Sequence, residues 1–210
     1  MSTVTAALAE PPALSPEDAD RAGFYGVLAN LLAAPPSDAL LGALAAAARL
    51  EADPAVPEGA ALAAAWARLC EAAGQADGEA VRAEWNTLFC GTGRPPVLPY
   101  ASFYETGFLM EKPLARVRDD LAALGLARET GCGEPEDHLA ALCDAMRALI
   151  SDGRHGIAVQ TPFFQRHLQR WIGRCCADMK AAADARFYRA VGDFAAAFFA
   201  VEARALSFET

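Results

Sequence analysis

Apolar residues recur along most of the chain at spacings of three and four positions, the period of an α-helix with one buried face. The clearest stripe follows Pro113, where Leu114, Val117, Leu121 and Leu124 share one face and charged residues occupy the other. No segment shows the strict alternation of apolar and polar residues that is typical of a β-strand. The pattern therefore predicts an all-α protein, a single helical domain of about eight or nine helices.

Caps and breaks predict where the helices begin and end. Ser15 is a typical helix start, Pro35-Pro36 ends that helix, and Ser37 begins the next one. Gly125 fits the left-handed position just past the helix that follows Pro113, where a Schellman ending needs it. Other helices are expected to begin near residues 57, 77, 135, 161 and 183.

The chain divides into a flexible N-terminal tail, residues 1–14, and an all-helical domain, residues 15–210. The least regular part of the domain is residues 90–99, Cys-Gly-Thr-Gly-Arg-Pro-Pro-Val-Leu-Pro, where prolines and glycines cannot continue a helix. This segment is either a long connection or a hinge between two halves. A hinge at residues 90–99 would permit domain swapping between two copies of the chain.

Composition narrows the range of functions. Apolar residues make up 54% of the 210 residues, Ala is abundant, and Val and Ile are scarce, which supports a helical protein with a sizeable core. Lys and Arg number 18 against 27 Asp and Glu, a net charge of −9 that argues against nucleic-acid binding and suits a basic partner. The N-terminus does not resemble a secretory signal peptide, and no stretch is apolar and long enough to span a membrane, so a cytoplasmic protein is expected.

The six cysteines do not suggest a disulfide framework or a zinc site, because none stand in Cys-x-x-Cys spacing, and we interpret them as reduced thiols. A carboxylate-bridged metal site needs two Glu-x-x-His pairs, which the sequence lacks. Cys90 with His138 is the one pair that would suit a cysteine nucleophile and its base. We expect no catalytic residue, metal or cofactor; the alternatives are a metal-dependent or cysteine-dependent helical-bundle enzyme and an all-α transcription regulator.

Two short motifs carry the remaining chemistry. Tyr100 and Tyr104 are four positions apart, so on a helix they would share one face, either in the core or lining an apolar groove for a peptide. Residues 134–138, Glu-Pro-Glu-Asp-His, read as a helix start with Pro135 in the first helical position and acids in the first turn. His138 in that turn is subject to opposing influences, since the helix dipole favours neutral imidazole and the acids favour the protonated form. The three acids together would attract a cationic segment.

Three blocks of the sequence resemble the TorD/DmsD-type redox-enzyme maturation chaperones, a family of all-helical cytoplasmic proteins of bacteria. Residues 85–91, Trp-Asn-Thr-Leu-Phe-Cys-Gly, are similar to the family's aromatic-x-x-Leu-Phe-x-Gly, although the family more often has Tyr at the position of Trp85. Residues 99–105, Pro-Tyr-Ala-Ser-Phe-Tyr-Glu, are similar to its Pro-aromatic-x-Ser-x-Tyr. The most specific block is residues 134–138, which is similar to the signature Glu-Pro-x-Asp-His.

The resemblance implies a TorD-like bundle and a chaperone without catalytic turnover. Such a chaperone binds the twin-arginine signal peptide and the apo-form of a molybdenum-cofactor oxidoreductase subunit, assists cofactor insertion and delays export. A twin-arginine leader joins two cations to an apolar stretch, so its receptor needs acids beside an aromatic groove. The client is expected to be a formate dehydrogenase or a sulfoxide, amine-oxide or nitrate reductase, and a homodimer is left open. The residues expected to bind the leader are Trp85, Tyr100, Tyr104, Glu134, Pro135, Glu136, Asp137 and His138.

Overall fold

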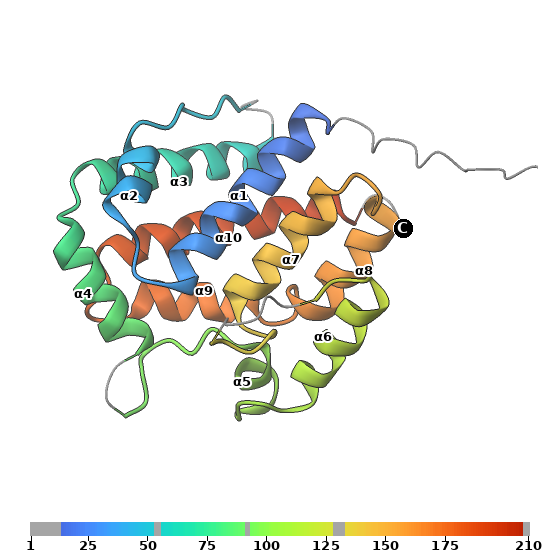
Figure 1. Ribbon diagram of the computed structural model, residues 1–210. Helices are drawn as coiled ribbons and strands as arrows, with labels where there is room; N and C mark the ends of the chain where they lie inside the picture. The colour runs from blue at the N-terminus through green and yellow to red at the C-terminus, as the bar shows by residue number, and fades with distance from the viewer. Residues whose placement is uncertain (1–13, 53–55, 91–92, 128–132, 208–210) are drawn as a thin grey trace, which may run out of the picture.

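The computed structural model describes residues 14–52, 56–90, 93–127 and 133–207, and within these ranges it contains ten α-helices and no β-strand (Figure 1). The all-α prediction is confirmed, with ten helices rather than eight or nine. Of the expected tail, residues 1–13 lie outside the described ranges, as do residues 91 and 92 of the predicted hinge. The helices are α1 (Pro16–Ala33), α2 (Asp38–Ala45), α3 (Pro57–Gly74), α4 (Gly78–Phe89), α5 (Ala101–Thr106), α6 (Lys112–Ala123), α7 (Leu139–Ser151), α8 (Ile157–His167), α9 (Ile172–Ala181) and α10 (Phe187–Ala205).

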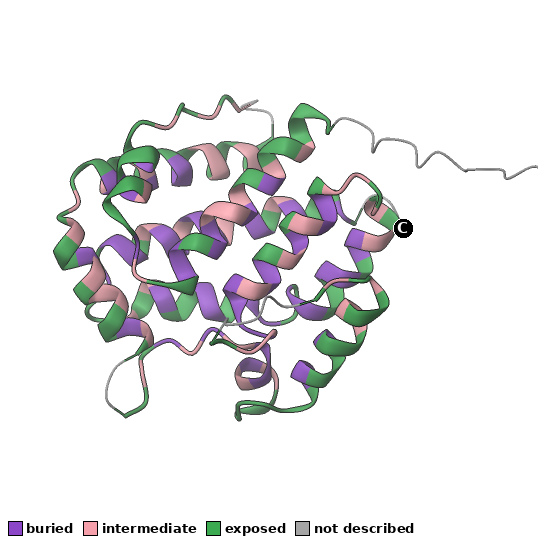
Figure 2. Cartoon of the chain, in the orientation of Figure 1, coloured by how far each residue is buried: buried purple, intermediate pink, exposed green. Residues whose placement is uncertain are grey.

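The core lies between two groups of helices that are distant in sequence. Helix α1 packs along α7, and α10 packs against α3 and α9. At the centre, the ring of Phe24 on α1 lies edge-on to Trp66 at 5.2 Å and to Phe194 at 5.4 Å between centroids. Figure 2 shows that buried residues gather on α7, α9 and α10, whereas α6 is mostly exposed. Aromatic residues from three helices therefore join the N-terminal and C-terminal parts of the chain.

The predicted caps are present. The hydroxyl of Ser15 accepts a hydrogen bond from the Asp18 N–H at 3.0 Å, and the hydroxyl of Ser37 accepts one from the Leu40 N–H at 3.2 Å. Gly125 has a φ of 70° after α6, and both bonds of the Schellman ending are formed. Local side-chain chemistry thus sets these helix ends where the sequence places them.

The single helix expected between the starts near residues 161 and 183 is wrong, because the structure has two helices there. Helix α8 begins earlier, at Ile157, and ends at His167, and α9 begins at Ile172. The break follows from one side chain, because the indole N–H of Trp171 donates to the His167 carbonyl at 2.6 Å and so takes the acceptor that a continued helix would use. The Gln169 N–H also reaches back five residues instead of four.

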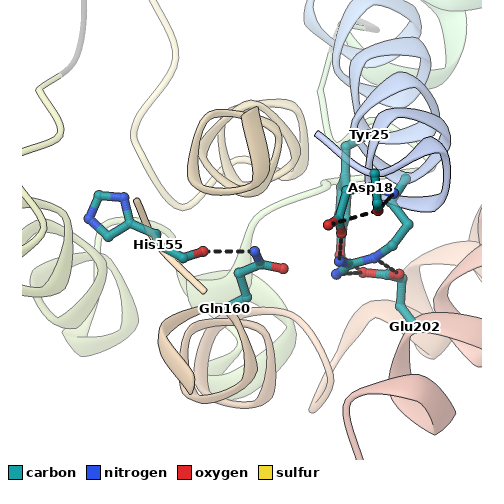
Figure 3. Close-up of polar contacts among 7 residues, drawn as sticks. Asp18, Tyr25, His155, Gln160 and Glu202 are labelled. Atoms are coloured by element: carbon teal, nitrogen blue, oxygen red, sulfur yellow. Dashed lines mark hydrogen bonds and ion pairs between the residues drawn. The ribbon is translucent and has the colours of Figure 1, made fainter. Parts of the chain in front are cut away.

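A buried ion pair connects α1 to α10 (Figure 3). Glu202 is 1% exposed, and its carboxylate accepts from Arg21 Nε at 2.7 Å and Nη2 at 3.0 Å. The hydroxyl of Tyr25 donates to the same carboxylate at 3.0 Å, and Asp18 accepts from Arg21 at 2.8 Å. Burial opposes the charge on Arg21, but the bonds to Glu202 raise the pKa of the guanidinium above its usual value. These bonds hold the two helices in register.

Candidate functional site

The second and third motif blocks meet through their backbones. The Ala101 N–H donates to the Asp137 carbonyl at 3.0 Å, and the Leu139 N–H donates to the Pro99 carbonyl at 2.7 Å. Tyr100 and His138 lie opposite each other in this short antiparallel pairing. Residues 99–101 and 137–139, which are distant in sequence, thus form one structural unit at the start of α7.

The pairing corrects the expected helix start. Pro135 is not in the first helical position, and the acids at 136 and 137 are not in a helical first turn, because α7 begins only at Leu139. Residues 136 and 137 lie in a turn that the His138 N–H closes on the Pro135 carbonyl at 3.0 Å, and His138 itself is extended, with φ −69° and ψ 141°, so the helix begins only after it. His138 is the N-cap residue of α7, and its Nδ1 accepts from the Ala140 N–H at 3.1 Å.

Asp137 fixes the loop from the inside. Its side chain is 1% exposed, and Oδ2 accepts from the Ser102 N–H at 2.9 Å in the first turn of α5. The hydroxyl of Ser102 in turn accepts from the Glu111 N–H at 3.2 Å, in the loop between α5 and α6. Asp137 Oδ1 is buried without a protein partner among the described residues. The Asp137 carboxylate thus connects residues 134–138, the signature loop, to α5 and, through Ser102, to the start of α6.

His138 is neutral in this arrangement. The side chain is 5% exposed, and its ring lies edge-on to Tyr100 at 4.9 Å between centroids. Burial lowers the pKa of His138 to about 4, although the charges of Glu134 and Asp137 oppose this shift. Because Nδ1 accepts a hydrogen bond, the proton of the neutral ring is on Nε2. The competition left open by the sequence is therefore decided by burial rather than by the neighbouring acids.

The two glutamates of the signature face the other way. Glu134 is exposed and accepts a hydrogen bond from the hydroxyl of Tyr100. Burial, together with this bond to Glu134, raises the pKa of Tyr100. Glu136 is partly exposed and accepts from Arg118 Nε on α6 at 2.9 Å, while Pro135 between them is half-buried. The loop therefore presents Glu134 at the surface, leaves the Glu136 side chain 16% exposed beneath Arg118, and keeps Asp137 and His138 inside.

The three aromatic residues expected to form a groove do not lie on one open face. Tyr100 is the N-cap residue of α5, so it does not share a helical face with Tyr104. Tyr104 is 7% exposed, stacks on Trp171 at 5.4 Å between centroids, and donates its hydroxyl to an aspartate of α9 at 2.7 Å. Trp85 is half-buried on α4 and has its ring contact with Phe89 of the same helix at 5.7 Å. Tyr104 is therefore a core residue in this structure.

An exposed apolar ridge, Phe108, Leu109 and Met110, follows α5 and was not predicted as part of the site. These side chains are 70%, 45% and 74% exposed. Gly107 and Met110 both have positive φ, 87° and 58°, so the backbone turns sharply at both ends of the ridge. The available signal was an apolar run that fits the stripe of neither neighbouring helix. A shallow depression of about 400 Å³ adjoins the ridge and is lined by Met110, Glu111, Lys112, Leu114, Ala115, Arg118 and Asp119.

The depression reaches the signature loop through Arg118, which lines it and bonds Glu136. Glu111, which follows the ridge, is connected to the same loop through Ser102, whose hydroxyl accepts the Glu111 N–H and whose own N–H donates to Asp137. Glu136 is thus connected, through Arg118, to the depression that Met110 of the apolar ridge also lines, near the edge of the molecule formed by α5 and α6 (Figure 1). This arrangement can bind a segment that carries both cations and apolar side chains.

The geometry gives little support to a cysteine nucleophile. Cys90 is exposed at the end of α4, and partial burial together with the charge of Glu134 raises the pKa of its thiol. A raised pKa disfavours the reactive thiolate. Nδ1 of His138, the candidate base, already accepts the Ala140 N–H. In the part of the chain that the structure describes, no cluster of three His, Cys, Asp or Glu side chains could hold a metal, and no helix is long and apolar enough to cross a membrane.

Comparison with known proteins places the chain in a family. The family described as nitrate reductase delta subunit matches residues 57–177, a segment that contains all three motif blocks. The chaperone protein TorD of Vibrio cholerae serotype O1 (strain O395) is 33% identical over 100 residues, which cover 43% of this chain and 46% of that protein. TorD of Vibrio parahaemolyticus serotype O3:K6 is 29% identical over 127 residues, covering 55% of this chain and 59% of that protein. The chain thus matches about half the length of these curated relatives.

The fold has a counterpart among solved structures. The crystal structure of an Archaeoglobus fulgidus protein assigned to redox enzyme maturation has a TM-score of 0.58, covers 93% of this chain and 99% of its own, and is 18% identical. At that identity the likeness shows a common fold. The match over residues 57–177, more than half of the chain, establishes that the chain belongs to the nitrate reductase delta subunit family, that of the TorD-type redox-enzyme maturation chaperones.

Proposed function

We propose that the protein is a cytoplasmic chaperone that binds the twin-arginine signal peptide and the apo-form of a molybdenum-cofactor oxidoreductase subunit, assists cofactor insertion and delays export. It acts by binding, without catalytic turnover. The observation that carries the proposal is the signature loop, which Asp137 and His138 anchor from within, while Glu134 lies at the surface and Glu136 is connected through Arg118 to the depression that Met110 of the ridge also lines. Family membership supports the same function.

The carboxylates of Glu134 and Glu136 suit the two cations of the leader. A guanidinium can donate two parallel hydrogen bonds to one carboxylate, and each charge-assisted bond contributes about 1.5–3 kcal/mol when it is shielded from water. Glu134 is exposed and Glu136 already binds a guanidinium, that of Arg118. The net charge of −9 adds a long-range attraction for a basic segment. We therefore assign the two arginines of the leader to this pair of glutamates.

The apolar ridge fits the hydrophobic part of the leader. Phe108 and Met110 are both exposed by 70% or more, and Met110 lines the depression that Arg118 also lines. Covering such side chains is favourable by roughly 25 cal/mol per Å² of apolar surface removed from water. Because Tyr104 is buried, it cannot supply this surface. We therefore assign the binding of the apolar segment to the ridge rather than to Trp85, Tyr100 and Tyr104.

Asp137 and His138 are assigned a positioning role. Each is at least 95% buried and holds a backbone N–H of α5 or α7. A double variant, Asp137→Ala with His138→Ala, is expected to weaken leader binding by releasing the loop that carries the glutamates. It is also expected to lower stability, which separates it from a variant at a surface contact.

The direct test is calorimetric titration of the full chain with a synthetic twin-arginine leader. The variant Glu134→Gln with Glu136→Gln keeps the shape and hydrogen-bonding capacity of both side chains and removes their charge. We expect it to bind the leader about tenfold more weakly or worse, since two charge-assisted contacts are lost. Glu71→Gln, on the exposed face of α3, removes one charge far from the loop and should leave the affinity unchanged.

The peptide supplies a second control. Replacing both leader arginines by lysines retains the charge but removes the bidentate geometry, so this peptide should bind more weakly than the original. Equal affinities for the two leaders, or for the double glutamine variant and wild type, would reject the assignment of the guanidinium site. Leaders from formate dehydrogenase and from sulfoxide, amine-oxide and nitrate reductases, titrated in parallel, would then rank the client classes.

A further inference from the structure

Met110 differs from the other methionines that the structure describes. Met146 and Met179 are 0% exposed and belong to the hydrophobic core, whereas Met110 is 74% exposed at the end of the apolar ridge. Met110 also lines the depression beside the ridge. Its thioether is therefore open both to a bound partner and to small molecules in solution.

The backbone on both sides holds Met110 in this place. The hydroxyl of Thr106 accepts from the Phe108 N–H at 3.3 Å, and the hydroxyl of Ser102 accepts from the Glu111 N–H at 3.2 Å. Both ends of the ridge are thus bonded to α5, and between them Met110 has a φ of 58°. The exposure of Met110 is therefore a fixed feature of the folded loop.

We propose that Met110 is a site of reversible oxidation by peroxides, and that its oxidation weakens binding of the apolar part of the leader. The inference rests on the proposed function and describes how that same site is regulated. Hydrogen peroxide transfers one oxygen atom to the thioether sulfur: the O–O bond breaks, an S–O bond forms and water leaves. The sulfur is oxidised by two electrons, and the peroxide is reduced by two. A thiol-dependent methionine sulfoxide reductase reverses the step, because two thiols become a disulfide and the oxygen leaves as water.

Oxidation changes the chemistry of the ridge where we assign the apolar contact. A thioether is polarizable and adapts to irregular apolar surfaces, so Met110 suits a segment of variable sequence. The sulfoxide oxygen is a hydrogen-bond acceptor that water satisfies in the free protein. An apolar segment that covers this oxygen removes the water and offers no donor in its place. Because the cost falls on the complex alone, oxidation lowers the affinity for the leader without unfolding the chaperone.

The core protects most of the other sulfur atoms from peroxide. Within the described ranges, the sulfur-containing residues that are at most 1% exposed are Met146, Met179, Cys143, Cys175 and Cys176. Cys90 is exposed and Cys70 is partly exposed, and burial raises the pKa of both thiols, which disfavours the thiolate that peroxides attack. A thiol reductant returns an oxidised cysteine from the sulfenic acid or disulfide to the thiol, but methionine sulfoxide needs its reductase. Peroxide followed by a thiol reductant therefore isolates the effect of methionine.

The experiment is calorimetric titration of the full chain with a twin-arginine leader that contains no methionine or cysteine, before and after this treatment. Peroxide and reductant are removed before each titration. We expect wild type to bind the leader about five- to tenfold more weakly after oxidation, since one polar group is buried without a partner. Methionine sulfoxide reductases A and B, added together, should restore the original affinity.

Two variants at position 110 and one at position 90 are the controls. Met110→Leu keeps an apolar side chain that peroxide does not oxidise, so its affinity after treatment should equal its own affinity before treatment. Met110→Gln places a polar side chain there and should weaken binding as oxidation does, but without peroxide. Cys90→Ser should retain the full response of wild type to peroxide.

Mass spectrometry of proteolytic fragments locates the added oxygen, and circular dichroism measures helicity. The fragment with Met110 should gain oxygen before those with Met146 and Met179, and helicity should not change. The inference is overturned if Met110 is not the first of the three to be oxidised, if oxidation reduces helicity, or if oxidised wild type binds as tightly as reduced wild type. An equal loss of affinity in Met110→Leu also overturns it. All of these results leave the proposed function in place, whereas failure of reduced wild type to bind the leader rejects both.

Discussion

Two of the arginine–glutamate pairs, Arg21–Glu202 and Arg118–Glu136, differ in their contact with water. Arg21 and Glu202 are 17% and 1% exposed and join α1 to α10 inside the core. Arg118 and Glu136 are 53% and 16% exposed and join α6 to the signature loop. A buried charge cannot leave its partner without a large penalty, whereas an exposed one can. The first pair therefore fixes the architecture, and the second contributes little to stability.

The same contrast holds for the aromatic residues. Phe198 on α10 is 1% exposed and its ring lies against Tyr25 at 4.8 Å between centroids. Phe108 in the ridge is 70% exposed. One phenylalanine contributes to the folded state and the other is available to a partner. The helices α1, α7 and α10 thus supply stability, and the edge formed by α5 and α6 carries the surface that we propose for binding.

The largest expected effect comes from exchanging these two phenylalanines for alanine. Phe198→Ala should lower the free energy of unfolding by about 3–5 kcal/mol, because it leaves a cavity among aromatic rings. Phe108→Ala should change it by no more than about 0.5 kcal/mol and should weaken leader binding. Urea unfolding and peptide titration measure the two quantities. A reversed order of stabilities would mean that the ridge is part of the core.

The fold was predictable because its signals are local. Apolar spacing indicated the helices, and Ser15, Ser37 and Gly125 set three of their ends through contacts within four or five residues. The end of α8 was missed because it depends on the indole of Trp171 rather than on a proline or glycine. No propensity scale carries that information.

The candidate site was only partly predictable, because its geometry comes from backbone pairing. The bond from Ala101 to Asp137 uses a backbone carbonyl, which leaves no pattern in the sequence. The sequence indicated residues 134–138 as candidate binding residues but could not show that Asp137 and His138 are buried while Glu134 is exposed. It also could not distinguish the exposed Phe108 from a core phenylalanine, since both are simply apolar residues in a helical protein.

The next effect concerns the two ion pairs. Arg21→Met leaves Glu202 buried without its cation, and the expected loss of stability is about 3 kcal/mol or more. Arg118→Met removes the exposed pair and should cost less than about 1 kcal/mol. Urea unfolding at neutral pH compares them directly. If Arg118→Met lowered the free energy of unfolding more than Arg21→Met, exposure to water would not explain the difference between the two pairs.

A smaller effect is expected at the start of α10. The carboxylate of Glu84 on α4 accepts the N–H groups of Arg186, Phe187 and Tyr188 at 2.8–3.1 Å, so it caps a helix about a hundred residues away. Glu84→Ala should lower stability by about 1–2 kcal/mol, the usual contribution of a helix cap. Glu79→Gln on the same helix is the control. A thermal unfolding series that shows no difference between the two variants would contradict the capping role.

The smallest expected effect is the acid sensitivity of the junction between core and edge, where His138 caps α7. The pKa of His138 is about 4 in the folded protein, and an unfolded histidine titrates near 6.5. The unfolded chain therefore binds a proton that the folded chain does not, so this contribution is complete above about pH 6.5 and is lost as the pH falls towards about 4. Between about pH 7 and 5.5, wild type should lose roughly 1 kcal/mol more stability than His138→Asn, in which asparagine can still cap the helix. Burial also lowers the pKa of His167, which remains in both proteins, so the difference between the two urea-unfolding profiles reports on His138. If the stabilities of the two proteins fell in parallel with pH, the lowered pKa of folded His138 would be contradicted.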